Sequence, residues 1–461
     1  MSIVASRLAR LIALTSVVSS GAACTAIFGL DDKQLEADGG SAHHDAAPSV
    51  TDAGHDAAAP CTPDDAGYHD FRTASCWSTY DVSPSLDLTP VYSGGTFDGR
   101  YVYFPSSFAG IVLRYDSQGD ASFGAESNWS SYSAPSDATY AGALFDGRYA
   151  YFIPAGDEVG LFTRYDTTLP FEDSGSWQTY MLNEENPISF IGGVFDGHYL
   201  YIAPSYSVDE GSSSGLVVRF DTTRDFTSDS SWTTFDLDTA KQGAQGYAGA
   251  LFDGRYVYLI PNAAAGVEQT AVVAARFDTT ASFGASTSWE FFDLSALPSA
   301  ARATSFQEGI YDGTSIYFVP TDVNSAVLQY DPTKSFTLPS SWTSFIPSSK
   351  DGLVGNGAMA RFAVGAFDGR NLYFVPSLPP DTSKNGLVLR WDDPRGSISD
   401  SSAWSSFDTN GIKATNFGSA VFDGRYLYLA PGSGIEITFA RFDAKETPLQ
   451  PALPDYFGSF Y

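Results

Sequence analysis

The residues of this chain that could do chemistry are of few kinds: histidines, cysteines and many carboxylates. His198 is the one histidine between residues 76 and 443. A catalytic histidine needs a nucleophile and an orienting partner, and the sequence around His198 identifies neither, so we expect a structural role. The chain has no His-Glu-x-x-His motif and no phosphate-binding loop, and we identify no nucleophile elbow. These three kinds of active site are therefore not indicated.

Carboxylates dominate the charge. The chain has 54 acidic and 25 basic residues and a formal net charge of −29. Nucleic acids and anionic membrane surfaces attract basic proteins, so we expect neither as a partner. Two carboxylates suffice to cleave a sugar chain, which leaves a polysaccharide hydrolase or lyase as an alternative to a protein without catalysis. Carboxylate oxygens also suit Ca²⁺, but no EF-hand run is present, so we expect no cofactor and treat Ca²⁺ as a weak alternative.

The start of the chain has the layout of an export signal. Two arginines precede an apolar run at residues 11–18, and small residues fill 19–23. The run is too short to span a membrane. This layout resembles a bacterial lipoprotein signal, and the resemblance implies that Cys24 becomes the lipidated first residue. We predict a signal peptide at 1–23, lipidation at Cys24 and an outer-membrane or cell-surface location, with a periplasmic or secreted protein as the alternative.

A tether and a cysteine pair follow. Residues 24–60 are rich in Ala, Asp, Gly and Pro and have few large apolar side chains, so they cannot bury enough surface to offset the entropy of ordering. The histidines in this tether are surrounded by nothing that would fix a metal geometry. In an exported chain, Cys61 and Cys76 predict a disulfide. Closing a loop of that length contributes roughly 3 kcal/mol of stability in the chain-entropy model.

The elements that must position these residues come from a repeat. The sequence Phe-Asp-Gly-Arg-Tyr-x-Tyr recurs with small changes, with successive copies 48 to 59 residues apart. A repeat at such a spacing determines the fold. The seven copies begin at Phe97, Phe145, Phe195, Phe252, Tyr311, Phe367 and Phe422.

Each copy predicts four short antiparallel strands. In the second copy, residues 140–145 and 148–153 flank Asp146-Gly147, which predicts a hairpin with a type I′ turn and positive φ at both turn residues. A third apolar run ends at Asp166, and a fourth begins near Trp177. Small residues crowd the first strand, so we expect it to be innermost. Four strands per copy predict propeller blades.

The third and fourth strands resemble those of kelch repeats, which form β-propellers. The resemblance covers about residues 76–443 and rests on the unit Arg-aromatic-Asp, turn, Trp, as in Arg164-Tyr-Asp166 followed by Trp177. Pro stands where kelch repeats have Gly-Gly after the second strand. The resemblance implies blade architecture and leaves the activity open. Residues that recur in every blade are expected to serve the fold; Arg164 and Asp166, for example, lie two apart on one strand, share a face and can pair within or between blades.

The ring has a predicted closure. The last copy has no Trp strand after Asp443, whereas Cys76-Trp-Ser-Thr-Tyr-Asp81 precedes the first copy. We therefore predict that residues 76–81 add the outermost strand to the last blade, which leaves no open end. The fold class is an all-β, seven-bladed propeller of four-stranded blades over residues 61–461. The tail after Asp443 is expected to pack back on it.

The loops that differ between copies indicate the functional face. The loops after the second strand and the connections between blades vary in length and leave the same face of an up-and-down blade. Variable loops on one face of a rigid repeat are the usual place for binding. The candidate contact residues there are Glu184, Glu185, Asn186, Tyr206, Asp209, Glu210, Glu268, Asp322, Lys350 and Asp381.

These observations predict an exported, lipid-anchored binding or scaffold module at the cell envelope. Its partner would be a protein or a glycan, and its only contact with the membrane would be through lipid at Cys24. We expect a monomer. The alternative, a polysaccharide hydrolase or lyase, requires two carboxylates about 5–10 Å apart in a cleft. A metal-dependent redox enzyme is less favoured, because His and Tyr–Cys ligand clusters are missing from the sequence pattern.

Overall fold

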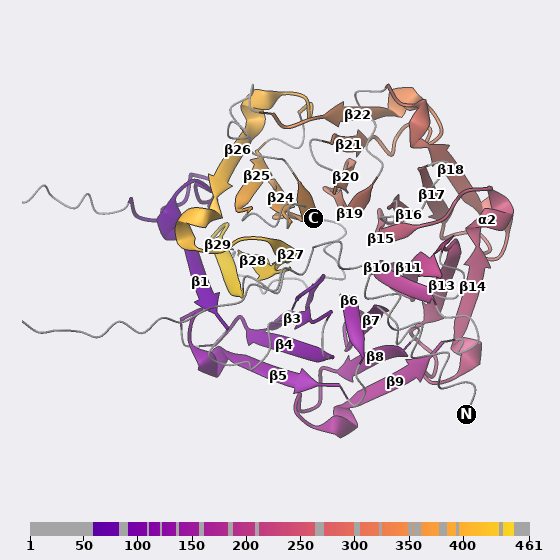
Figure 1. Cartoon of the computed structure of the whole chain (residues 1–461), viewed down its shortest axis with the longest axis horizontal. Helices are drawn as coiled ribbons and strands as arrows, with labels where there is room; N and C mark the ends of the chain where they lie inside the picture. The colour runs from indigo at the N-terminus through magenta and orange to yellow at the C-terminus, as the bar shows by residue number, and fades with distance from the viewer. Residues whose placement is uncertain are drawn as a thin grey trace, which may run out of the picture. The chain divides into compact units, whose positions relative to one another are not determined.

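The described part of the chain forms seven antiparallel sheets around one axis (Figure 1). This computed structural model describes residues 59–82, 91–107, 110–119, 122–134, 138–155, 161–182, 188–207, 212–262, 272–298, 305–321, 325–348, 353, 361–377, 385–392, 396–432 and 437–446. Residues 1–58 lie outside it, and with them the predicted signal, Cys24 and nearly all of the tether. Residues 447–461, most of the predicted C-terminal tail, lie outside it as well.

Each sheet is a blade whose strands follow one another from the axis outward. The first four blades are β2 (Thr96–Phe97), β3 (Tyr101–Pro105), β4 (Ile111–Asp116) and β5 (Trp129–Ser133); β6 (Thr139–Phe145), β7 (Tyr149–Ala155), β8 (Leu161–Asp166) and β9 (Trp177–Met181); β10 (Ile188–Phe195), β11 (Tyr199–Ser207), β13 (Leu216–Asp221) and β14 (Trp232–Asp236); and β15 (Tyr247–Phe252), β16 (Tyr256–Pro261), β17 (Val273–Asp278) and β18 (Trp289–Asp293). In the third blade, β12 (Ser212–Ser213) also pairs with β11.

The last three blades repeat this order. They are β19 (Phe306–Tyr311), β20 (Ile316–Pro320), β21 (Val327–Tyr330) and β22 (Trp342–Phe345); β23 (Phe362–Phe367), β24 (Leu372–Pro376), β25 (Leu387–Trp391) and β26 (Trp404–Asp408); and β27 (Phe417–Phe422), β28 (Tyr426–Pro431), β29 (Thr438–Asp443) and β1 (Trp77–Asp81). The predicted seven-bladed propeller is therefore confirmed.

A short 3-10 turn precedes each outermost strand. The turns are η1 (Ala74–Cys76), η2 (Glu126–Asn128), η3 (Ser174–Ser176), η4 (Asp229–Ser231), η5 (Ser286–Ser288), η8 (Pro339–Ser341) and η10 (Ser401–Ala403). Among the described residues, three short helical segments follow an outermost strand: α2 (Leu237–Ala240), η6 (Leu294–Ala296) and η11 (Thr409–Ile412). In each of these three, the Asp that ends the strand caps the turn with its side chain.

The first strand of each blade is innermost, as predicted. The inner strands lie next to one another around the axis (Figure 1). A Cβ on Gly192 would lie 2.9 Å from the carbonyl oxygen of Ala248 in the next blade, and one on Gly142 would lie 3.0 Å from that of Ile191. Small residues are thus required because neighbouring backbones approach closely. The second strands are apolar on both faces, since blades stack on both sides, as in the fully buried run of β20.

The ring closes as predicted, with more of the N-terminal segment than expected. Strand β1 pairs with β29 from Trp77↔Phe442 to Asp81↔Thr438. The indole nitrogen of Trp77 donates to the carbonyl oxygen of Phe71 at 3.0 Å. Trp129 makes the same bond to Phe123, six residues before it, at 2.9 Å. Residues 68–81 therefore supply both the connection and the outer strand of the seventh blade.

Candidate functional site

The turns after the inner strands form one face of the propeller, here called the Asp-Gly face. In the second blade, Asp146 Oδ1 accepts hydrogen bonds from the backbone N–H groups of Arg148 (2.8 Å) and Tyr149 (2.7 Å). Its Oδ2 accepts a hydrogen bond from the hydroxyl of Tyr151 at 2.6 Å. Gly147 has φ 101°, but Asp146 is not at positive φ. The predicted type I′ turn is therefore wrong: the Asp side chain, as in Asx turns, holds the turn, and only Gly needs the left-handed region.

All seven blades use the same three hydrogen bonds. In each, one carboxylate oxygen accepts two backbone N–H groups and the other accepts a tyrosine hydroxyl. The aspartates are Asp98, Asp146, Asp196, Asp253, Asp312, Asp368 and Asp423.

The repeated Arg and Asp residues of the third strand, such as Arg164 and Asp166, pair within their blade but not with each other. Arg148, on the turn, binds Asp166 at 2.7 Å. Arg164 instead donates to Gln178 at 2.7 and 2.9 Å and stacks over the ring of Tyr149. Register explains this outcome, because Asp166 lies directly opposite Tyr149, one residue from Arg148. Only the sixth blade has an ion pair within the motif, between Arg390 and Asp392.

His198 takes the place of the turn arginine and makes the same contact. Its Nε2 lies 3.1 Å from Asp221 Oδ1, and its ring stacks on Tyr199. This contact supports the structural role that we expected. The tryptophans of the outer strands are also structural, since the Trp177 indole nitrogen donates to the Phe171 carbonyl oxygen and the side chain is buried.

Three ionisable groups of the Asp-Gly face, Asp278, Tyr151 and Tyr330, have pKa values shifted away from neutral pH. The Arg255 guanidinium holds the pKa of Asp278 at about 2. Burial raises the pKa of the Tyr151 hydroxyl, and the neighbouring Asp146 carboxylate adds to this. Burial also raises the pKa of Tyr330 to about 12. Since acid–base catalysis needs a pKa near the working pH, these groups serve the fold.

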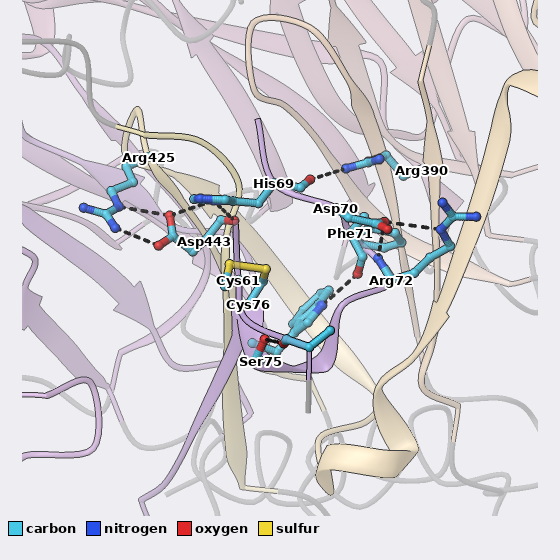
Figure 2. Close-up of a disulfide and its surroundings, with 12 residues drawn as sticks. Cys61, His69, Asp70, Phe71, Arg72, Ser75, Cys76, Arg390, Arg425 and Asp443 are labelled. Atoms are coloured by element: carbon cyan, nitrogen blue, oxygen red, sulfur yellow. Dashed lines mark hydrogen bonds and ion pairs between the residues drawn. A yellow bond between two sulfur atoms is a disulfide. The ribbon is translucent and has the colours of Figure 1, made fainter. Parts of the chain in front are cut away.

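The predicted disulfide joins Cys61 and Cys76 (Figure 2). It closes a segment, residues 61–76, that lies over the sixth and seventh blades on the Asp-Gly face. In this segment, His69 Nδ1 lies 2.8 Å from the carbonyl oxygen of Asp443. His69 is buried and is a second propeller histidine that the sequence search, limited to residues 76–443, did not consider.

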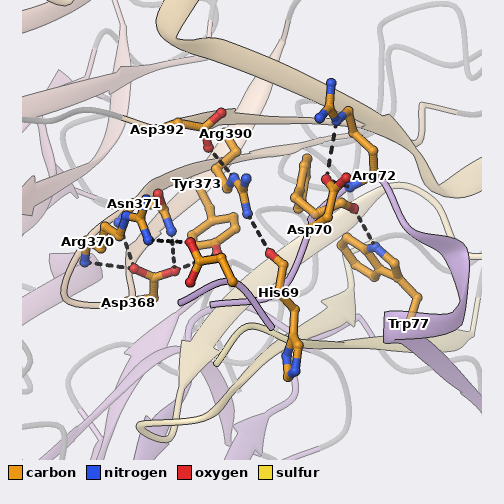
Figure 3. A network of polar contacts seen from close by, with 12 residues as sticks. His69, Asp70, Arg72, Trp77, Asp368, Arg370, Asn371, Tyr373, Arg390 and Asp392 are labelled. Atoms are coloured by element: carbon orange, nitrogen blue, oxygen red, sulfur yellow. Dashed lines mark hydrogen bonds and ion pairs between the residues drawn. The ribbon is translucent and has the colours of Figure 1, made fainter. Parts of the chain in front are cut away.

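The same segment explains why the sixth blade departs from the pattern. Arg370, the turn arginine, binds Asp64 of the N-terminal segment at 2.7 Å. Arg390 Nη1 donates to the carbonyl oxygen of His69 at 3.3 Å, and its guanidinium stacks over the Phe71 ring. Figure 3 shows the contact between Arg390 and His69, with Asp368, which is fully buried, nearby. In the sixth blade, the N-terminal segment therefore supplies the carboxylate for the turn arginine, whereas the third strand supplies it in the second blade, where Asp166 binds Arg148.

The opposite face, here called the variable face, is the one on which the contact residues were predicted. Of these, the structure describes Tyr206, which is partly buried on β11 and lies opposite Ser189 and Ser213. The others lie outside the described residues: Glu184, Glu185, Asn186, Asp209, Glu210, Glu268, Asp322, Lys350 and Asp381. Their grouping stays a prediction. Gly211-Ser-Ser-Ser-Gly215 does match the letters of a nucleophile elbow, but Ser213 is buried in β12 and has no strand-to-helix turn after it.

Four polar side chains near the start of the inner strands break the symmetry of the ring. Asn262 Nδ2 donates to the Phe306 carbonyl oxygen at 2.9 Å and to Gln307 Oε1 at 3.4 Å. Glu308 Oε2 accepts a hydrogen bond from Gly365 N in the next blade at 2.8 Å.

The fourth member of this group is Arg361. Its Nε donates to the Thr321 carbonyl oxygen at 2.9 Å. The side chains of Asn262, Gln307, Glu308 and Arg361 are partly exposed. We call these four residues the axial group.

The sequence analysis missed the axial group, although the signal was present. When the seven inner strands are aligned, the position that corresponds to Glu308 holds a small or apolar residue in the other six blades. These residues are Gly94, Gly142, Gly192, Gly249, Val364 and Ser419. Functional residues are expected where repeats differ, whereas the prediction for this strand rested on the small residues that its copies share.

A second polar feature of the variable face is a shallow depression beside α2. It is lined by Asp238, Gln242, Gly243 and Gln245. Asp238 Oδ1 accepts a hydrogen bond from Gly243 N at 2.6 Å, so this carboxylate shapes the loop that it lines. Among the described residues, no group of three or more His, Cys, Asp or Glu could hold a metal ion. No helix of the described residues is both long and apolar enough to cross a bilayer.

Comparisons with known proteins bear on the fold only. No protein-family model matches the chain, and no curated protein matches it. Among solved structures, the chain is similar to Chaetomium thermophilum Raptor at 10% identity and a TM-score of 0.49. That match covers 80% of this chain and 29% of Raptor, so the chain corresponds to less than a third of that protein. Kuenenia stuttgartiensis hydrazine synthase matches at 13% identity and a TM-score of 0.46, over 78% of this chain and 97% of the other.

A further similarity is to BamB from Moraxella catarrhalis. The identity is 12% and the TM-score is 0.40, over 83% of this chain and 95% of BamB. The β-propeller architecture is compatible with a binding or scaffold role, and fold alone does not define an activity.

Proposed function

We propose that this protein is an exported, lipid-anchored module that binds a protein or a glycan at the cell envelope through its variable face. One observation supports this most directly. The repeated polar residues of the Asp-Gly face are used in internal bonds in blade after blade, whereas the axial group occurs on one side of the ring only. A ligand needs an asymmetric site, which the variable face offers.

The lipoprotein signal, the kelch-like resemblance and the monomeric state belong to the proposal as sequence interpretations. The two-cysteine pattern expected of an exported protein agrees with the disulfide between Cys61 and Cys76. Replacing Cys24 by Ser is expected to move the protein from the membrane to the soluble fraction of cells. Retention of the variant in the membrane fraction would contradict lipid anchoring at this residue.

The alternative of a polysaccharide hydrolase or lyase gains no support from the described residues. Such an enzyme needs two carboxylates facing one cleft. On the described residues of the seven inner strands, Glu308 is the one carboxylate. Binding without cleavage is therefore the function that the arrangement favours.

The proposed function is tested by capture. The mature chain is applied to a glycan array and used to capture proteins from envelope extracts, in parallel with Tyr206→Ala and with Asp238→Ala. We expect one or both variants to capture less ligand. Glu172→Ala, on the exposed Asp-Gly face, is the control and should capture as much as the wild type. Equal capture by the variable-face variants and loss in the control would overturn the assignment of the face.

A further inference from the structure

Two connections between blades on the variable face follow the same plan, one after the third blade and one after the sixth. Each begins after the Asp that ends the outer strand, Asp236 or Asp408, and this Asp caps a short helical segment, α2 or η11. Two backbone hydrogen bonds then tie each connection to the loop that precedes the third strand of the same blade. The donors and acceptors are Leu237 to Gly215 and Gly246 to Ser214 in the third blade, and Thr409 to Gly386 and Asn416 to Asn385 in the sixth.

The connection of the third blade is the longer of the two, and the extra residues can be located. It spans residues 237–246, whereas its counterpart spans 409–416. In the shorter connection a left-handed residue, Lys413, follows the helical segment directly, but in the longer one the left-handed Gly243 follows only after two more residues. Since functional residues are expected where repeats differ, this insertion is a candidate for ligand contact. The two inserted residues are Lys241 and Gln242.

The insertion borders the polar depression beside α2. The depression has a volume of about 420 Å³, within the range of roughly 300–1,000 Å³ that is typical of ligand sites. It is lined by Asp238, Gln242, Gly243 and Gln245. Asp238 Oδ1 holds the longer connection by accepting a hydrogen bond from Gly243 N at 2.6 Å, which leaves Oδ2 of the same carboxylate for a ligand. The corresponding residue of the sixth blade, Asn410, instead donates through its Nδ2 to the capping Asp of η11 at 2.7 Å.

The chemistry of this lining favours an uncharged ligand rich in hydroxyl groups. The described side chains that line the depression are one carboxylate, which accepts hydrogen bonds, and two primary amides, which both accept and donate them. A hydroxyl group bonds to either kind, because it is both a donor and an acceptor. These lining residues include no aromatic or aliphatic side chain, so an apolar ligand would gain little from them. An anionic ligand would be repelled by Asp238 and by a chain whose formal net charge is −29.

The depression lies at the same end of the third blade as the predicted contact residue that the structure describes. The hydrogen bond from Gly246 N to the Ser214 carbonyl oxygen holds the longer connection against the segment that follows β12. Within β12, Ser213 pairs with Tyr206 on β11. The depression is therefore part of the face on which sequence reasoning placed the ligand.

We propose that this depression binds an uncharged sugar unit of an envelope glycan, with Asp238 and Gln242 bonding to its hydroxyl groups. The inference rests on the proposed function and narrows its ligand from a protein or a glycan to a glycan. Asp238 contributes most, because a hydrogen bond to an ionised carboxylate is stronger than one between neutral groups. Gln242 contributes less and belongs to the insertion that the sixth blade lacks.

The test titrates the mature protein by calorimetry with the methyl glycosides of glucose, galactose, mannose and N-acetylglucosamine, and with glucuronate as an anionic probe. Asp238→Asn removes the charge but retains an oxygen for Gly243 N, and Gln242→Ala shortens an exposed side chain, so both variants should fold, which thermal unfolding verifies. Glu172→Gln removes one negative charge on the Asp-Gly face. We expect at least one neutral glycoside to bind equally to the wild type and to Glu172→Gln, about tenfold more weakly to Asp238→Asn and about threefold more weakly to Gln242→Ala.

The inference is overturned if no neutral glycoside binds the wild type, or if Asp238→Asn binds as tightly as the wild type does. A preference for glucuronate would overturn it in favour of an acidic ligand. Capture of an envelope protein that depends on Asp238, without binding of any glycoside, would overturn it in favour of a protein.

The proposed function is judged separately. If Asp238→Asn captures envelope ligands as well as the wild type while Tyr206→Ala captures less, binding by the variable face stands and the assignment of the depression fails. If the wild type captures nothing from extracts or arrays, the proposed function fails even where a free glycoside binds.

Discussion

The two faces of the propeller use polar residues in opposite ways. On the Asp-Gly face, the same carboxylate accepts the same three hydrogen bonds in every blade, as Asp146 does. On the variable face, polar side chains differ from blade to blade, and Glu308 stands where four blades have glycine. Repetition therefore marks residues that hold blades together, and departure from repetition marks residues that can recognise a ligand. Each prediction below tests one side of this comparison.

The largest expected effect is on the Asp-Gly face, at its most buried carboxylate. Asp368 is fully buried and accepts hydrogen bonds from the N–H groups of Arg370 and Asn371 and from the hydroxyl of Tyr373. Asp368→Ala leaves these donors unpaired, which should lower the free energy of unfolding by about 3–5 kcal/mol. The same change at the partly exposed Asp98 should cost about 1–2 kcal/mol, because water can replace the lost acceptor. Urea unfolding measures both.

A loss below about 1 kcal/mol at Asp368, or equal losses at Asp368 and Asp98, would show that these bonds do not hold the blades. Reduced ligand capture by a folded Asp98→Ala protein would break the comparison from the other direction.

The second largest effect on stability is expected at the seam, the place where the N-terminal residues 61–81 join the seventh blade. The Cys61–Cys76 disulfide spans 15 residues and closes the segment in which Asp64 binds Arg370 and the His69 carbonyl oxygen accepts a hydrogen bond from Arg390. Reduction, or the double change Cys61→Ser and Cys76→Ser, should lower stability by roughly 3 kcal/mol. Thermal unfolding with and without reductant measures this. The double variant, which has no bond to reduce, should be insensitive to reductant, and an unchanged wild-type midpoint would remove the role assigned to the bond.

The fold was predictable because each blade repeats its local signals. The missing Trp strand after Asp443 and its presence at Trp77 led to the closure, which β1 and β29 confirm. The role of Phe71 was not predicted, although a phenylalanine six residues before the tryptophan, as with Phe123 and Trp129, also repeats. This spacing is a second repeated signal, and it marks the same outer strand.

Pairing across strands was less predictable than the strands themselves. Arg164 and Asp166 share a face of one strand, which made their pairing plausible from sequence. Their actual partners, Gln178 and Arg148, come from neighbouring strands and are determined by register, which the spacing within one strand does not contain. For the site, Glu308 could have been found by aligning the inner strands, whereas nine of the ten predicted contact residues lie outside the described residues and stay predictions.

A smaller effect on stability is expected at a tyrosine that recurs near the start of the inner strands, because its hydroxyl is hydrogen-bonded in some blades and not in others. The Tyr140 hydroxyl donates to Thr163 Oγ1 at 3.0 Å. Among the described residues, the buried hydroxyls of Tyr92 and Tyr247 have no hydrogen-bond partner. Tyr140→Phe should therefore cost about 1 kcal/mol, while Tyr92→Phe and Tyr247→Phe should be neutral or stabilising, because they remove an unpaired buried polar group. Unfolding of the three variants measures this. Similar losses of stability in all three variants would mean that the hydroxyls of Tyr92 and Tyr247 are also hydrogen-bonded, either to bound water or after a local shift.

The smallest effect is a pH dependence confined to the Asp-Gly face. The Arg255 guanidinium lowers the pKa of Asp278 from 3.8 to about 2. A carboxyl group whose pKa is lower in the folded state stabilises the protein above its ordinary pKa, and this contribution is lost as the pH falls from about 4 to about 2. Asp278→Asn should flatten the decline in stability over that window by a fraction of a kcal/mol, since the pair is partly exposed. Urea midpoints between neutral pH and pH 2 measure the slope. An unchanged slope in Asp278→Asn would show that the ion pair between Arg255 and Asp278 does not stabilise the folded protein.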